Sequence, residues 1–119
     1  MPESPSVLIV EPSADEREVL RTVLARRGLR IFEADQAAEG LELARQHRPA
    51  VIVLDQAAQA TTTERWREEL TTDDGTRPSL IILGKVRRES SADDGEVVAR
   101  PYHFGPLVAR IEALAARAA

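Results

Sequence analysis

The sequence has no cysteine and only two histidines, His47 and His103. Without cysteine there are no disulfides, thiolate nucleophiles or thiolate metal sites, and two scattered histidines do not complete a zinc site alone. Aromatic residues make up only 3% of the chain, against 43% for hydrophobic residues as a whole, so aliphatic side chains must build the core. These absences leave a globular protein that folds without covalent or zinc cross-links.

The chain also lacks an excess of positive charge and a long apolar run. Its formal net charge of -4 gives no basic surface for a nucleic-acid backbone, and no apolar run approaches the length of a membrane span. The polar, proline-containing start cannot form the apolar core of a signal peptide, so none is expected. At 119 residues the chain accommodates one domain, expected to span residues 1–119 with a polar tail at 1–5. We therefore expect a cytoplasmic protein whose partners are proteins rather than nucleic acid or membrane.

Short apolar runs alternate with helical patterns along the chain. The runs at 7–10, 51–54 and 80–83 are continuous, as is typical of strands that are buried on both faces. Further runs at 29–34 and 97–99 complete five predicted strands, and helices are predicted at 14–27, 36–47, 61–70 and 106–115. This alternation predicts an α/β, flavodoxin-like fold, with a doubly wound five-stranded parallel sheet in the order 2-1-3-4-5.

The segment 85–96 interrupts the alternation, because Val86 and Ala92 are its only apolar residues and build no amphipathic helix. The fourth helix of the fold is therefore expected to be missing or vestigial. Its absence predicts an exposed apolar face over the fourth and fifth strands and the final helix, including Val108 and Ile111. A homodimer through this face is one expected interaction.

Local motifs mark both ends of the first predicted helix. Ser13 and Glu16 have the spacing of a capping box, in which Ser13 accepts a hydrogen bond from the first turn and Glu16 reaches back to the cap. Gly28 is placed for the C-cap. Both ends of this helix are therefore predicted from side-chain chemistry as well as from periodicity.

Three stretches carry a resemblance that extends over essentially the whole chain. They read VLIVEPSADEREVL, RPAVIVLDQ and VVARPYHFGPLVARIEAL. In order and spacing they are similar to the receiver domains of response regulators in two-component signalling, which implies that Asp55 is the phosphoacceptor. The resemblance also implies a divalent cation held by Glu11, Asp55 and the backbone carbonyl of Ala57. Receiver domains are signalling modules, so the chain is not expected to be an enzyme.

The chain departs from the receiver pattern at several positions. Pro12 stands in place of the second acid, Gly84 in place of the switch hydroxyl, Val97 in place of the switch aromatic, and Arg100 in place of the lysine that contacts the phosphoryl group. Pro101 keeps the proline of the family's Lys-Pro pair, which implies a cis peptide before it. These departures predict a degenerate pseudo-receiver that binds magnesium weakly and has no other cofactor.

Three functions are compatible with these residues. The leading interpretation is a receiver-like module that acts by binding protein partners, such as a histidine kinase or a regulator, with weak or absent phosphorylation. The alternative is an active receiver whose Asp55 is phosphorylated by a histidine kinase. A small flavodoxin-like cofactor binder is disfavoured, because the loop after the first strand is acidic and repels a phosphate group.

Overall fold

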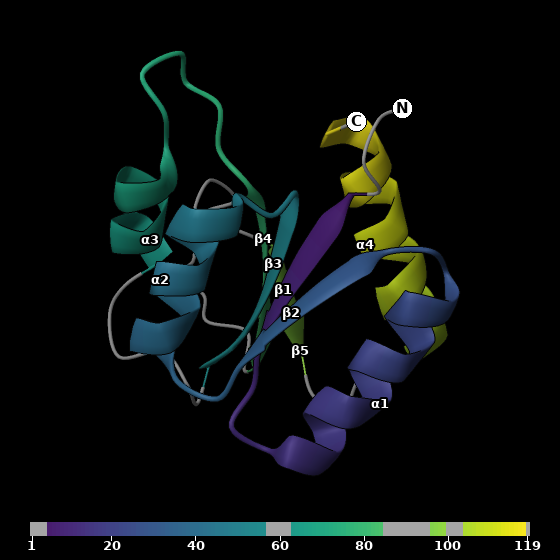
Figure 1. Ribbon diagram of the computed structural model, residues 1–119. Coiled ribbons are helices and arrows are strands. Elements are labelled where there is room, and N and C mark those ends of the chain that lie inside the picture. The colour runs from purple at the N-terminus through teal and green to yellow at the C-terminus, as the bar shows by residue number, and fades with distance from the viewer. Residues whose placement is uncertain (1–4, 57–62, 85–95, 100–103, 119) are drawn as a thin grey trace.

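Five strands form a sheet between two helical layers (Figure 1). The computed structural model describes residues 5–56, 63–84, 96–99 and 104–118. The strands are β1 (Ser6–Val10), β2 (Arg30–Ala34), β3 (Val51–Asp55), β4 (Ser79–Gly84) and β5 (Glu96–Ala99), and the helices are α1 (Ala14–Arg26), α2 (Ala37–His47), α3 (Thr63–Leu70) and α4 (Phe104–Ala118). Within these ranges, no helix combines the length and apolarity that crossing a membrane requires.

The strands are parallel and lie in the order β2-β1-β3-β4-β5, as the alternating pattern predicts. This order places the carboxyl ends of β1 and β3 side by side. The segment 85–95 lies outside the described residues, so the missing fourth helix stays a prediction.

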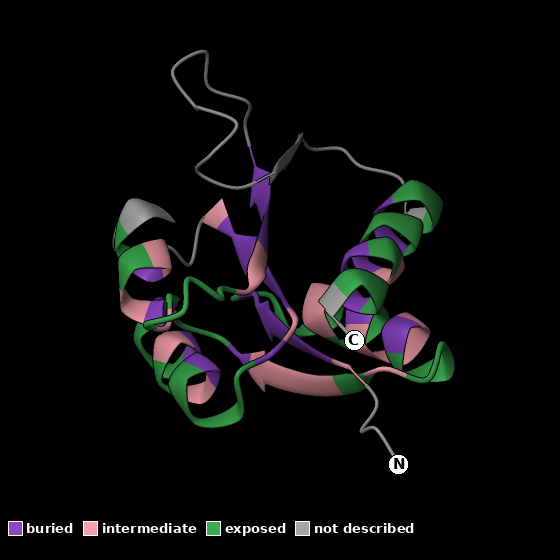
Figure 2. Ribbon diagram, turned by 90° about the horizontal axis from the view of Figure 1, so that it is seen from above, coloured by how far each residue is buried: buried purple, intermediate pink, exposed green. Residues whose placement is uncertain are grey.

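Alternate residues of each strand point to opposite helical layers, because successive side chains of a strand face opposite sides of a sheet. Val7 and Ile9 of β1 pack in one core cluster with residues of α1 and α4. Leu8 and Val10 pack in a second cluster with residues of α2 and α3. Figure 2 shows this arrangement as buried strands in the centre and helices that are buried on their inner sides. The sheet is therefore held rigidly on both faces, which fixes the loops at its carboxyl edge.

The prediction that the final helix and the fourth strand expose an apolar face is wrong. Val108 and Ile111 of α4 are only 2% and 0% exposed, and the aliphatic side chains of β4 are buried as well. The apolar side chains of α4 pack against β1, β3, β4 and α1. Among the described residues of α4 and β4, no leucine, isoleucine or valine is exposed, so the homodimer predicted through this face loses its apolar basis.

A hydrogen-bonded turn joins α3 to β4 and contains an acid of unusual strength. Asp74 Oδ1 accepts hydrogen bonds from the Thr72 hydroxyl and, at 3.0 Å, from the Thr76 amide. Gly75 follows with a φ of 86°, a conformation that glycine adopts without strain. The hydrogen bond from Thr72, together with those from Thr76, lowers the pKa of Asp74 to about 2.

We expect the Asp74 carboxyl to titrate near pH 2, because folding favours its charged form. The pKa of Asp74 in the folded protein lies below its ordinary value of 3.8. The charged Asp74 carboxylate therefore stabilises the fold at pH values above 3.8, and this contribution is lost as the pH falls toward 2. A carbon-detected NMR titration measures the midpoint directly. The variant Thr72→Val removes the main donor, so its Asp74 pKa is expected to move back toward the ordinary value. A wild-type midpoint near 4 would contradict the prediction.

Candidate functional site

Three acidic side chains meet at the carboxyl edge of the sheet. Glu11 directly follows β1, Asp55 is the last residue of β3, and Glu16 lies in the first turn of α1. One carboxylate oxygen of each lies within 4.8 Å of the others. Glu11 and Asp55 are buried and Glu16 is half-buried. The sequence predicted Glu11 and Asp55 at this site, and the structure brings them together.

Glu16 is the site residue that the sequence interpretation missed. The predicted cap is formed in part, since the Glu16 amide donates to Ser13 Oγ at 3.3 Å. The Ser13 amide, however, donates to Glu11 Oε2 at 3.1 Å. The Glu16 carboxylate lies instead in the acidic cluster. Pro12 is exposed and has no carboxylate, so Glu16 supplies the third acid that this position lacks.

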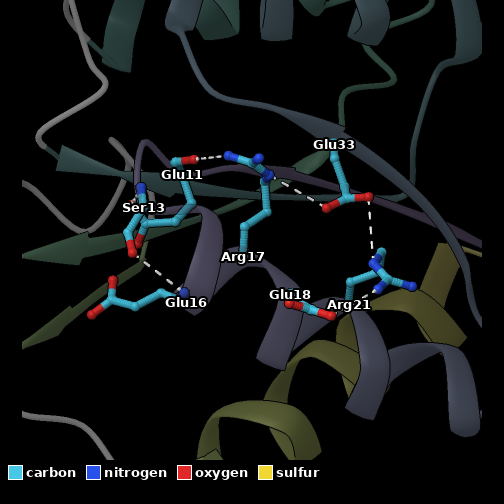
Figure 3. Close-up of polar contacts among 7 residues, drawn as sticks. All are labelled: Glu11, Ser13, Glu16, Arg17, Glu18, Arg21 and Glu33. Carbon is cyan, nitrogen blue, oxygen red and sulfur yellow. Dashed lines mark hydrogen bonds and ion pairs between the residues drawn. The ribbon is translucent and has the colours of Figure 1, made fainter.

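Arg17 fixes the backbone beside the acidic cluster (Figure 3). Its Nη1 atom donates to the Glu11 carbonyl oxygen at 2.7 Å, and its Nε atom lies 3.3 Å from a Glu33 carboxylate oxygen. Arg21 contacts the other oxygen of Glu33 at 3.5 Å. The loop that carries Glu11 is therefore tied both to α1 and, through Glu33, to β2.

The donor set fits a hard divalent cation. Magnesium and calcium take oxygen ligands at about 2.0–2.6 Å, so opposing ligands stand roughly 4–5 Å apart, which matches the spacing of the three carboxylates. Close carboxylates repel one another unless a cation or a proton lies among them. Glu11 and Asp55 belong to the predicted ligand set, whereas Ala57 lies outside the described residues. The three carboxylates therefore suit a hard divalent cation such as magnesium.

Sequence comparison finds relatives among bacterial regulators. No protein-family model matches the chain. Protein PilH of Pseudomonas aeruginosa is 27% identical over 103 residues, which cover 85% of each chain. The transcriptional regulatory protein AfsQ1 of Streptomyces coelicolor is 33% identical over 121 aligned residues, covering 95% of this chain and 52% of its own. KdpE of Escherichia coli, the KDP operon transcriptional regulatory protein, is 30% identical over 112 residues, covering 89% of this chain and 49% of its own. The chain thus spans about half the length of the latter two.

Solved structures agree with this result. The Francisella response regulator 1452 receiver domain superposes with a TM-score of 0.76 at 19% identity, covering 98% of this chain and 100% of its own. The chemotaxis response regulator CheY4 of Vibrio cholerae superposes with a TM-score of 0.76 at 17% identity, covering 93% and 98%. The chain is therefore similar in sequence to bacterial regulators and has the fold of response-regulator receiver domains. Its homologues are receiver domains, which are signalling modules and not enzymes.

The predicted switch positions are described in part. Gly84 ends β4, is buried, and offers no hydroxyl beside the acidic cluster. Val97 lies in β5 opposite Ile82, although its side chain lies outside the described atoms. Arg100 and Pro101 lie outside the described residues, so the predicted cis peptide before Pro101 stays a prediction.

A cavity of about 650 Å³ lies at the opposite, amino edge of the receiver sheet. Residues at the ends of α2 and α3 line it, among them Arg45, Arg48 and Glu69. Arg45 and Glu69 form an ion pair with each other across the two helices. None of the three clustered acids lines this cavity, so it is separate from the receiver site.

Proposed function

We propose that this receiver domain is an active phosphoacceptor whose Asp55 takes a phosphoryl group from a histidine kinase. One observation carries the proposal: Glu11, Glu16 and Asp55 place carboxylate oxygens within 4.8 Å of one another. The sequence favoured weak or absent phosphorylation because Pro12 replaces an acid and because Gly84, Val97 and Arg100 depart from the receiver pattern. Glu16 supplies a carboxylate from the next turn, which removes the main reason to expect a weak cation site.

Each residue of the site has its own role in the proposed phosphoryl transfer. A carboxylate oxygen of Asp55 forms the new O–P bond as the N–P bond of the donor phosphohistidine breaks, and the released imidazole takes up a proton. Glu11, Glu16 and Asp55 would hold a magnesium ion, which when bound would supply positive charge against the phosphoryl oxygens. The Ser13 amide orients Glu11 through its hydrogen bond at 3.1 Å.

A second candidate function is favoured by Gly84. A receiver without a hydroxyl at the end of β4 lacks one group that follows the phosphoryl group, so such a module would act by binding a protein partner in its unmodified state. Both functions use protein partners, and they differ in whether Asp55 must be modified.

Acetyl phosphate with magnesium is expected to add one phosphoryl group to the protein, detected as an increase in intact mass. Asp55→Asn is expected to abolish the addition completely, because the amide nitrogen is not a nucleophile. The exposed acid Asp35 provides a matched control, and Asp35→Asn is expected to be modified like the wild type. A folded wild-type protein that gains no phosphoryl group at saturating magnesium would exclude the proposal and leave partner binding without modification.

A further inference from the structure

The side chain of Gln56 fills the space in which a side chain at Gly84 would lie. Asp55 pairs with Leu83 in the sheet. Gln56, which follows β3, and Gly84, the last residue of β4, are therefore the next residues of the two segments, just beyond Asp55. A Cβ atom built on Gly84 would lie 2.3 Å from Gln56 Oε1, 2.7 Å from Gln56 Cβ and 3.0 Å from Gln56 Cδ. The first two of these separations are below 3.0 Å, and real Cβ atoms essentially never come so close to another heavy atom. Any side chain at 84 therefore requires Gln56 to move.

This contact explains why glycine stands at the end of a buried strand. Glycine weakens a strand interior, and it usually marks a bend, a bulge or a close approach. The positive-φ glycines of the described residues are Gly28 and Gly75, so the backbone of Gly84 needs no left-handed conformation. The close approach of the Gln56 side chain is therefore our explanation for the glycine at position 84. The two positions are therefore sterically coupled: a glutamine at position 56 requires a glycine at position 84, and a larger residue at position 84 requires a smaller side chain at position 56.

We infer that Gln56 is a positioning residue that replaces the switch hydroxyl of this receiver domain. Its carboxamide lies within 3.0 Å of the point where the Cβ of a switch residue would stand. A carboxamide both donates and accepts hydrogen bonds, and rotation about its last bond places Nε2 where Oε1 now lies. In the phosphorylated protein Nε2 donates to a phosphoryl oxygen on Asp55. This role rests on the proposed phosphorylation of Asp55.

Beryllium fluoride with magnesium is the probe, because it forms a stable phosphoryl analogue on a carboxylate, and amide NMR shifts report its binding. Gln56→Met keeps the side-chain volume against Gly84 but removes the donor. We expect it to bind beryllium fluoride roughly tenfold more weakly, as for a lost hydrogen bond to a charged group. A purely structural role would leave the affinity of this variant unchanged. Gln46→Ala, at an exposed glutamine of α2, is the matched control and is expected to bind like the wild type.

The double variant Gln56→Ala with Gly84→Thr tests the coupling in the same experiment. Gly84→Thr alone is expected to lower the ratio of folded to unfolded protein about tenfold or more, because it overpacks the site. Adding Gln56→Ala opens the space, so the double variant is expected to regain stability in urea and to bind beryllium fluoride through the new hydroxyl.

The outcomes separate the two proposals. If the wild type binds beryllium fluoride and Gln56→Met binds equally well, the positioning role is overturned while the phosphoacceptor function stands. If the wild type binds none, the phosphoacceptor function fails and the positioning role fails with it. If Gly84→Thr is as stable as the wild type, the steric coupling of the two residues is also overturned.

Discussion

Glu16→Gln is expected to reduce the affinity for magnesium by at least tenfold. The change keeps the shape of the side chain and its helix position but removes one of the three carboxylates that lie within 4.8 Å of one another. Loss of an outer hydrogen-bond partner of a metal ligand already costs about 10- to 100-fold in affinity, and loss of a ligand is expected to cost at least as much. A magnesium titration followed by amide NMR shifts around residues 11–16 and 55 gives both affinities.

Glu18→Gln is the matched control for this experiment. Glu18 lies on the same helix, its side chain is 69% exposed, and it contacts Arg21 rather than the acidic cluster. Its replacement is expected to leave the magnesium affinity unchanged. Equal affinities for Glu16→Gln and the wild type would show that Glu16 serves only the start of α1, and the cation site would then rest on Glu11 and Asp55 alone.

Trp66→Ala is expected to cost about 3–5 kcal/mol of unfolding free energy, the range for loss of a large buried aromatic side chain. Trp66 is only 1% exposed and belongs to the core cluster between the sheet and the helices α2 and α3. The indole comes so close to α2 that its Cη2 atom would lie 3.3 Å from a Cβ at Gly40. Removing it leaves a cavity that neither α2 nor β1 can close without moving.

Urea unfolding followed by far-ultraviolet circular dichroism measures this loss without relying on the tryptophan signal. Glu68→Ala is a suitable control on the same helix, because Glu68 is exposed and such changes usually stay within about 0.5 kcal/mol. Trp66→Phe retains most of the buried area and is expected to lose less than Trp66→Ala. An unchanged urea midpoint for Trp66→Ala would mean that α3 does not depend on this contact.

The fold could be predicted from the sequence because its strands are buried on both faces. A continuous apolar run such as 51–54 is hard to mistake, and the observed strand Val51–Asp55 differs from it by one residue. Parallel strands with helical crossovers then leave few possible topologies. The end of α1 followed in the same way from Gly28, which adopts a φ of 83°.

The parts that could not be predicted depend on contacts between segments that local patterns do not contain. Ser13 and Glu16 have a spacing that describes a helix cap, and nothing in that spacing says that the Glu16 carboxylate returns to the end of β3. Gln56 and Gly84 are far apart in the sequence and meet only because β3 and β4 pair in the sheet. The sequence pattern therefore shows only that position 84 has no hydroxyl, and does not show that the Gln56 side chain fills the space beside it. The exposure predicted for Ile111 was wrong. The prediction rested on the missing helix in segment 85–96 and did not consider that α4 itself packs on the sheet.

The charges around Glu33 also protect the protein from self-association through its sheet. β2 lies at one edge of the sheet, and the outer backbone groups of an edge strand can recruit a strand from another molecule. Here Arg17 and Arg21 hold Glu33 near the end of that strand, and Arg30 begins it. An incoming strand would have to strip water from these charges, so the edge resists the intermolecular pairing that leads to aggregation.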